Sequence, residues 1–172
     1  MSYWQLYYHF VWAMHRQSSL TEDAALPVRL TTINDLVRTR AQRLGATVFA
    51  VGGTATHIHL VASVPPRLAL STFVGQVKSG VSRHINHHGL LPHHFHWQET
   101  YGAVSVERQH LPHLVTYVDH QARLHAEGKT IAMLETVEGD TQEVLAVTQD
   151  YFAIDSDVWR AELLALDAQL FT

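Results

Sequence analysis

The sequence predicts an α+β fold in which helices pack on a mostly antiparallel sheet. Segments rich in aromatic and bulky residues alternate with segments whose apolar residues recur at helical spacing, in the order β-α-β-β-α-β-α. The two middle strand segments, 47–53 and 56–64, are separated by too few residues for a crossover helix. They should therefore pair as an antiparallel hairpin.

Each expected element has its own local signal. The first strand is aromatic, the third stops at a pair of prolines, and glycines or prolines punctuate the helix ends. The strand segments are 3–14, 47–53, 56–64 and 94–106, and the helical segments are 22–44, 68–87 and 110–127. This order of elements is that of a ferredoxin-like or RRM-like sandwich.

Charge is divided unevenly along the 172 residues. Residues 1–130 hold 11 Lys and Arg against 7 Asp and Glu, a balance of +4, whereas residues 131–172 hold one Arg against 9 acids, a balance of −8. All 14 histidines lie in the first segment. We therefore predict a mildly basic working domain over 1–130 and an acidic, partly helical C-terminal extension over 131–172.

The composition excludes several classes of protein. The chain has no cysteine, which rules out disulfides and thiolate metal sites. No apolar run approaches the roughly 20 residues that a membrane-spanning helix needs. The N-terminus also lacks the basic start and cleavage site of a signal peptide. We therefore expect a cytoplasmic protein with no membrane partner.

Two histidines in the third expected strand are the first candidates for chemistry. His57 and His59 flank Ile58, and residues two apart on a strand point to the same face. Two imidazoles side by side can hold a divalent cation. The pattern alone leaves a second interpretation open, in which both are half-exposed strand histidines without a ligand.

The last expected helix offers a nucleophile and a further ligand on one face. Tyr117 and Gln121 are four residues apart, which places them on the same side of a helix. A tyrosine becomes a covalent nucleophile when a metal or a base activates it, and an amide oxygen suits a hard cation. Without the histidine pair, Tyr117 is more simply a tyrosine of the helix surface or the core edge.

The chain resembles the single-tyrosine HUH transposases of the IS200-like type, in which a hydrophobic residue lies between two metal-binding histidines. It looks closest to their REP-associated tyrosine transposase branch. The resemblance covers roughly residues 7–128 and rests on blocks in the family's order. These blocks are YYHFVWA (7–13), GGTATHIHLVASVPP (52–66), QVKSGVSRHIN (76–86), WQETYGAVSV (97–106) and YVDHQ (117–121).

The resemblance implies a metal-dependent transposase that nicks and rejoins single-stranded DNA. His57, His59 and Gln121 would hold Mg²⁺ or Mn²⁺, which would polarise the scissile phosphate. The Tyr117 hydroxyl would attack that phosphorus, form a 5′-phosphotyrosine bond and release a 3′-OH. Attack by another 3′-OH would then join new strands without a nucleotide cofactor.

The same resemblance implies partners. Members of the family are typically homodimers that recognise hairpins at element ends, and in some of them the tyrosine helix docks against the partner's histidines. We therefore expect a homodimer acting on single-stranded DNA with a REP-like or element-end hairpin. The sequence leaves open whether Tyr117 acts in its own chain or in its partner.

Basic and aromatic residues elsewhere are further candidates. Arg16, Arg67, Lys78 and Arg83 are candidate phosphate contacts, with a solvated surface as the alternative interpretation. Tyr101 is the rival nucleophile, but it lies in an expected strand and no Gln follows it four residues later.

One departure from the family leaves a second function open. An Asp commonly precedes the first metal-binding histidine in relatives, whereas Thr56 stands there in this chain. A missing carboxylate would weaken the orientation of His57 or its affinity for metal. The alternative hypothesis is therefore a non-catalytic or domesticated protein that binds DNA hairpins and retains the transposase fold.

Overall fold

One open antiparallel sheet organises the molecule. The computed structural model describes residues 3–20, 25–138 and 158–170. The strands are β1 (Tyr7–Ala13), β2 (Thr47–Gly53), β3 (His57–Ser63) and β4 (Gly102–Val106). They lie in the order β2-β3-β1-β4, and every neighbouring pair is antiparallel. The α+β prediction and the hairpin of β2 with β3 are confirmed.

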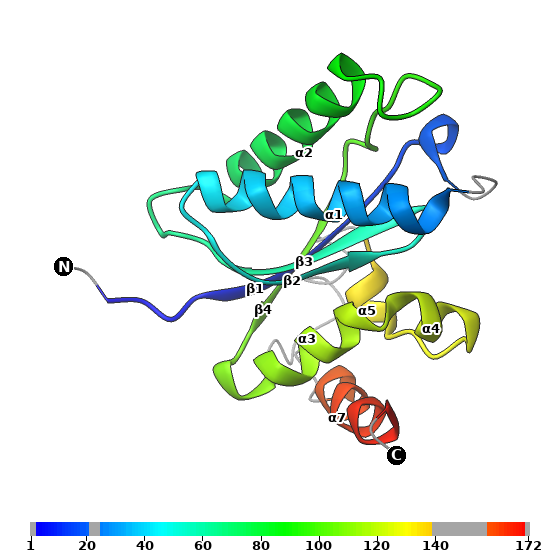
Figure 1. Cartoon of the computed structure of the whole chain (residues 1–172). Helices are drawn as coiled ribbons and strands as arrows, with labels where there is room; N and C mark the ends of the chain where they lie inside the picture. The colour runs from blue at the N-terminus through cyan, green and yellow to red at the C-terminus, as the bar shows by residue number, and fades with distance from the viewer. Residues whose placement is uncertain (1–2, 21–24, 139–157, 171–172) are drawn as a thin grey trace.

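Helices cover both faces of this sheet (Figure 1). On one face lie α1 (Leu26–Arg43) and α2 (Leu70–His87), and on the other lie α3 (Leu111–Asp119), α4 (Gln121–Ala126), α5 (Ala132–Glu135) and α7 (Val158–Leu170). Short 3-10 turns, η1 (Arg16–Ser18) and η2 (Arg108–His110), follow β1 and precede α3. No helix in the described part of the chain is long and apolar enough to cross a membrane.

The alternation of side chains along the central strands builds a core on each side. Phe10 and Trp12 of β1 belong to the core beneath α1 and α2. Val61 of β3 belongs to the second core, which α3 and α7 cover. Because residues two apart on a strand share a face, His57 and His59 point to the same side as Val61. The sheet therefore presents the histidine pair toward the layer that contains Tyr117.

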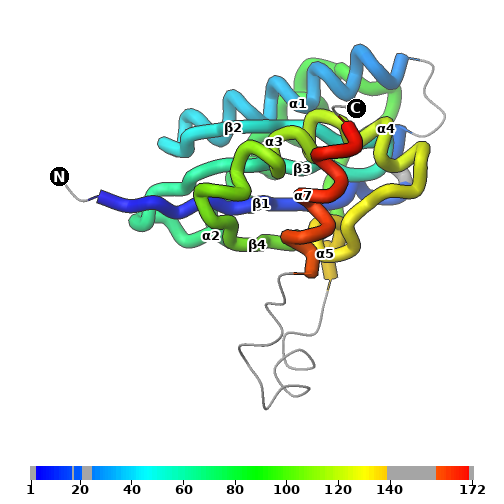
Figure 2. The backbone as a smooth tube through the Cα atoms, turned by 90° about the horizontal axis from the view of Figure 1, so that it is seen from below, coloured from blue at the N-terminus to red at the C-terminus, as the bar shows by residue number. Residues whose placement is uncertain are grey.

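Part of the acidic extension packs on the second face. The helical part expected in the extension is found as α7, which lies beside α3 (Figure 2). Its Trp159 and Leu163 are buried in the same core as Leu114 and Val118 of α3. Residues 139–157 of the extension lie outside the described residues. The division of the chain at residue 130 stays a prediction.

Two expected elements differ in detail. The helix expected over 110–127 is two helices, α3 and α4, interrupted at His120, where the backbone has φ −107° and ψ 19° and the imidazole bonds the Thr116 carbonyl at 2.8 Å. The strand expected from residue 94 begins only at Gly102. The side chain of Asn86 bonds both backbone polar groups of Phe95, at 2.7 and 2.8 Å, and the N–H of Gln98 donates to the carbonyl of Ala13 at 3.0 Å, so this segment is held by α2 and by an isolated bridge at the end of β1.

A glycine sets how closely α3 approaches the sheet. A Cβ atom at Gly52 of β2 would collide with the carbonyl oxygen of Val118, the residue after Tyr117. Gly52 is also paired with His59 across β2 and β3. The absence of a side chain at this one position therefore lets the tyrosine helix lie directly over the histidine strand.

Replacing Gly52 with Ala is expected to lower the free energy of unfolding by about 1–3 kcal/mol, because the new methyl group overpacks a backbone contact. Denaturant unfolding of the two proteins measures the difference. Gly75→Ala is the matched control, since Gly75 is exposed on α2 with nothing within 4 Å of an added Cβ. In that control the free energy of unfolding should rise by about 0.5–1 kcal/mol. A Gly52→Ala protein as stable as the control would show that α3 is free to move away from β2.

Candidate functional site

The histidine pair of β3 lies against a carboxylate of the acidic extension. Glu135 is the last residue of α5, and its Oε2 atom lies 3.2 Å from Nε2 of His57 and 3.3 Å from Nε2 of His59. His59 is fully buried, and the side chain of Glu135 is only 17% exposed. The two histidines do share a face, as their spacing predicted, and that face is closed by the acidic extension.

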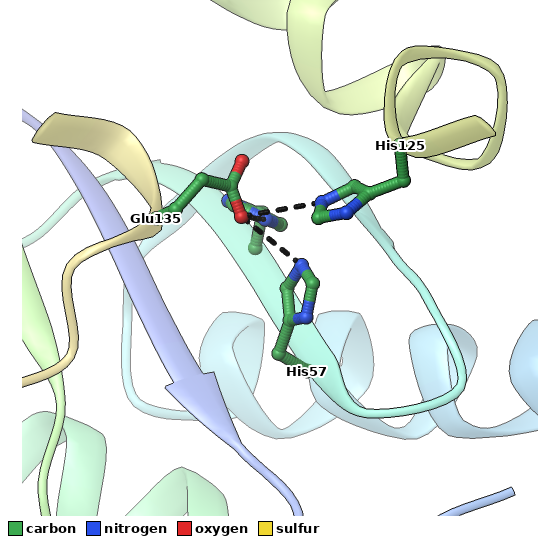
Figure 3. A group of neighbouring side chains, drawn as sticks. His57, His125 and Glu135 are labelled. Carbon is green, nitrogen blue, oxygen red and sulfur yellow. Dashed lines mark ion pairs between the residues drawn. The ribbon is translucent and has the colours of Figure 1, made fainter. Parts of the chain in front are cut away.

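A third histidine joins this group from α4. Nε2 of His125 lies 3.3 Å from the same Oε2 atom of Glu135. Figure 3 shows the carboxylate of Glu135 facing the imidazoles of His57 and His125, with dashed lines for the ion pairs that join them. One ligand atom from each of the four side chains lies within 4.8 Å of the others, so this group could hold a metal ion.

Tyr117 lies beside this group, within the same chain. Tyr117 is only 1% exposed. Its hydroxyl donates a hydrogen bond to Oε1 of Glu135, and the backbone N–H of Ile131 donates to that hydroxyl at 3.1 Å. Burial, followed by the hydrogen bond to Glu135, raises the pKa of Tyr117 above its usual value. The phenol is therefore held protonated in this arrangement.

The carboxylate at the centre is held charged. Burial alone would raise the pKa of Glu135, but its contacts with His57 and His59 and with Tyr117 lower that pKa by more. The net pKa lies well below the usual value for a glutamate. Glu135 is thus an anion whose one oxygen faces three imidazoles while the other faces the phenol.

Unpartnered atoms around this anion suit a cation. Gln121 is 1% exposed and donates from Nε2 to the Tyr117 carbonyl at 3.2 Å, while its Oε1 has no hydrogen-bond partner among the described residues. In the same part of the chain, the Nε2 atoms of His57 and His59 also lack a hydrogen bond. Buried polar atoms without a hydrogen bond are costly, and these three are candidate ligands for a metal ion.

The remaining nitrogen of each histidine in the pair has a partner. Nδ1 of His59 lies 2.8 Å from Nε2 of His9, a fully buried histidine of β1. Nδ1 of His57 lies 3.1 Å from the hydroxyl of Thr54 and 3.0 Å from that of Thr56. Such bonds fix ring orientation and leave Nε2 for a ligand. Thr56 therefore supplies a hydroxyl contact where an aspartate is commonly found in relatives.

The family of the chain is shown by a comparison with family models. Residues 2–121, well over half of the chain, match the model for IS200-like transposases. The chain belongs to the IS200-like transposase family. That membership indicates a role in DNA transposition, and it covers β1 to Gln121, including the histidine pair and Tyr117.

Solved structures are similar to this transposase at the level of the fold. One is a transposase candidate from Deinococcus radiodurans, at 22% identity and a TM-score of 0.50, over 70% of this chain and 95% of that one. Another is a REP-associated tyrosine transposase bound to a REP hairpin, at 14% identity and a TM-score of 0.49, over 74% of this chain and 75% of that one. No curated protein matches.

A cleft of about 630 Å³ opens beside the histidine group of the transposase. His57 and Glu135 form one part of its lining, and the exposed Arg16 and the side chain of Gln98 form another. Arg16 is the only one of the four candidate phosphate contacts among the residues that line this cleft. Its guanidinium could contact a phosphate that reaches the histidines.

The other candidate phosphate contacts lie elsewhere. The ammonium of Lys78 donates to the carbonyls of Gln98, Glu99 and Thr100, and burial lowers its pKa. Lys78 therefore fixes the loop before β4. Arg67 and Arg83 are exposed, and Tyr101, the rival nucleophile, packs against the core beneath α1 and α2. A DNA contact by any of these basic residues stays a prediction.

Three residues of the site were missed by sequence reasoning. His125 continues the spacing of Tyr117 and Gln121 by another four residues, which was a usable signal. His9 lies in the first family block, but its contact with His59 requires the register of β1 and β3. Glu135 carried no signal, because it is one of several acids in a segment without a recognisable pattern.

Replacing His9 with Leu is expected to lower the free energy of unfolding by about 1–3 kcal/mol, since it leaves Nδ1 of the buried His59 without a partner. His9→Gln is the matched variant, because its amide nitrogen can take the place of Nε2. Denaturant unfolding of the metal-free proteins measures both. Equal stability of His9→Leu and His9→Gln would show that the contact between the two rings is only one of packing.

Proposed function

We propose that this transposase is a metal-dependent enzyme that cleaves and rejoins single-stranded DNA through a 5′-phosphotyrosine formed by Tyr117. One observation carries the proposal. The hydroxyl of Tyr117 and the Nε2 atoms of His57 and His59 all contact the carboxylate of Glu135. A candidate nucleophile and candidate metal ligands are therefore within reach of one reacting group.

Each residue has a role in this proposal. His57, His59 and Gln121 hold a divalent ion, Mg²⁺ or Mn²⁺, through atoms that lack a hydrogen bond within the described structure. When bound, that ion supplies Lewis-acid polarisation of the scissile phosphate. The oxygen of Tyr117 forms a bond to phosphorus as the bond from phosphorus to the 3′-oxygen breaks. The phenol proton is lost, and the departing 3′-oxygen gains one.

The hydroxyl of Tyr117 must change partner before it attacks. In the structure its hydrogen is donated to Glu135, and the pKa of the phenol is raised by burial. A phenol with such a pKa is a poor nucleophile near neutral pH. We propose that the arrival of the phosphate at the histidines separates Tyr117 from Glu135 and turns its oxygen toward phosphorus.

The substrate in this proposal is single-stranded DNA that carries a hairpin. Support comes from membership of the transposase family and from the five sequence blocks that resemble its REP-associated branch. The cleft beside His57 would receive the strand at the scissile phosphate, with Arg16 on the phosphate backbone. The exposed Arg67 and Arg83 would contact DNA outside this cleft, whereas Lys78 would have to leave the three carbonyls that it bonds to do so.

Incubation with labelled hairpin DNA and Mn²⁺ is expected to yield a covalent protein–DNA adduct that survives denaturing electrophoresis. Tyr117→Phe should abolish that adduct, because no other oxygen at the site can form the phosphotyrosine bond. Tyr101→Phe is the matched control and should form the adduct, since Tyr101 packs on the opposite face of the sheet. An adduct that persists in Tyr117→Phe but disappears in Tyr101→Phe would assign the nucleophile to Tyr101.

The alternative function is that of a non-catalytic or domesticated protein that binds DNA hairpins. The observation that favours it is the burial of Tyr117, whose hydroxyl is occupied by Glu135. Under this alternative, several hairpins would bind with no adduct in any divalent ion. Incubation of the wild type with hairpin DNA therefore separates the two functions.

The nucleophile is expected to act in its own chain, because Tyr117 and the histidine pair already meet within one chain. The proposed homodimer then pairs two complete sites. Mixing Tyr117→Phe protein with His57→Ala protein tests this point on hairpin DNA. No adduct should form in the mixture, because neither chain has a complete site. Adduct formation only after mixing would show that Tyr117 serves the partner's histidines.

A further inference from the structure

We propose that His125 and Glu135 bind the same ion as His57 and His59, and that the four side chains form a site for a transition ion such as Zn²⁺ in preference to Mg²⁺. This inference keeps His57 and His59 of the proposed metal site, replaces Gln121 and the Mg²⁺ or Mn²⁺ proposed there, and does not rest on the strand-transfer reaction. Neither residue lies within the matched family region, which ends at residue 121.

The distances from Glu135 to the three imidazoles are close to those of a four-coordinate site, and the four ligand atoms all lie within 4.8 Å of one another. Zinc binds imidazole and carboxylate at about 2.0–2.1 Å, and a tetrahedron with such bonds has edges of about 3.3–3.4 Å. Oε2 of Glu135 lies 3.2, 3.3 and 3.3 Å from the Nε2 atoms of His57, His59 and His125. The carboxylate oxygen is thus already one edge length from each imidazole.

The nitrogens approach that oxygen without pointing at it. Nε2 of His57 and Nε2 of His59 lie at hydrogen-bonding distance from Oε2 of Glu135, yet neither has a hydrogen bond among the described residues. In a tetrahedral site each ligand aims at the central ion, about 35° away from the edge to the next ligand. Short distance without alignment is therefore the expected arrangement around an ion.

The rings are held with Nε2 directed inward. His9 occupies Nδ1 of His59, and the hydroxyls of Thr54 and Thr56 lie against Nδ1 of His57. Contacts of this kind orient metal-binding histidines. Direct pairing of the imidazoles with the carboxylate of Glu135 is the competing explanation, and it predicts no tight binding of Zn²⁺.

The donor set selects the class of ion. Three imidazoles and one carboxylate suit Zn²⁺ and Co²⁺, whereas Mg²⁺ prefers oxygen ligands in a regular octahedron and keeps several waters. Glu135 also links the ion to the nucleophile, because its second oxygen accepts the hydrogen bond from Tyr117. A phosphate oxygen can then join the ion only as a fifth ligand or by displacing a protein ligand.

Optical titration of the metal-free full chain with Co²⁺ tests the coordination. Four-coordinate Co²⁺ has strong visible bands, whereas six-coordinate Co²⁺ has weak ones. We expect strong bands that Zn²⁺ abolishes, and calorimetry should give an affinity for Zn²⁺ at least about 100-fold above that for Mg²⁺. Weak bands, or an affinity for Mg²⁺ equal to that for Zn²⁺, would overturn the inference.

Variants test the ligand set. Glu135→Gln and His125→Ala should each lower the affinity for Zn²⁺ by about 10–100-fold or more and weaken the Co²⁺ bands. Glu138→Gln, three residues further along the same segment, is the matched control and should bind Zn²⁺ as the wild type does. Unfolding curves of the metal-free proteins verify that each variant folds. Wild-type affinity in both Glu135→Gln and His125→Ala would remove them from the site.

The inference and the proposed function fail separately. Four-coordinate Co²⁺ in a protein that forms no DNA adduct would support the metal site and contradict strand transfer. An adduct formed by a protein whose Co²⁺ is six-coordinate would support strand transfer and contradict the four-coordinate metal site.

Discussion

The register between β1 and β3 is the constraint on which the rest of the site depends. Side chains alternate along a strand, so a slip of one residue would turn His57 and His59 into the core beneath α1 and α2. The register is fixed because both faces of these strands are buried, with Phe10 and Trp12 on one side and Val61 on the other. The cores therefore do more than stabilise the sheet, since they decide which layer of helices the histidines can reach.

Glu135 joins segments that are far apart in the sequence. A buried carboxylate is unfavourable unless it is paired, and its partners here come from β3, α3 and α4. The backbone position of Glu135 depends in turn on β4. The carbonyl of the next residue, Thr136, lies where a side chain at Gly102 would be. The tyrosine helix, the histidine strand and the acidic extension are therefore coupled through one charge, so that a change at any of them affects the others.

The sequence predicted the fold well because the fold depends on local patterns. Aromatic strands, helical spacing and punctuation by glycine were sufficient, and Gly45 and Gly128 do adopt positive φ at helix ends. The site was predicted only in part. His57, His59, Tyr117 and Gln121 carry spacings that a single element reveals. The roles of His9 and Glu135 depend on the pairing of strands and on the packing of a distant segment. Such long-range contacts produce no periodic pattern in the sequence.

Two side chains of the histidine group, His125 and Glu135, lie beyond the region that the family model describes. Members of a family can thus share every residue of a common motif and still differ in the ion they retain or the ease with which their nucleophile is released. Such divergence would arise from the segment on the C-terminal side of the shared domain. In this chain Glu135, at the end of the four-residue helix α5, contacts both the imidazoles and the nucleophile, so a substitution there would change both properties.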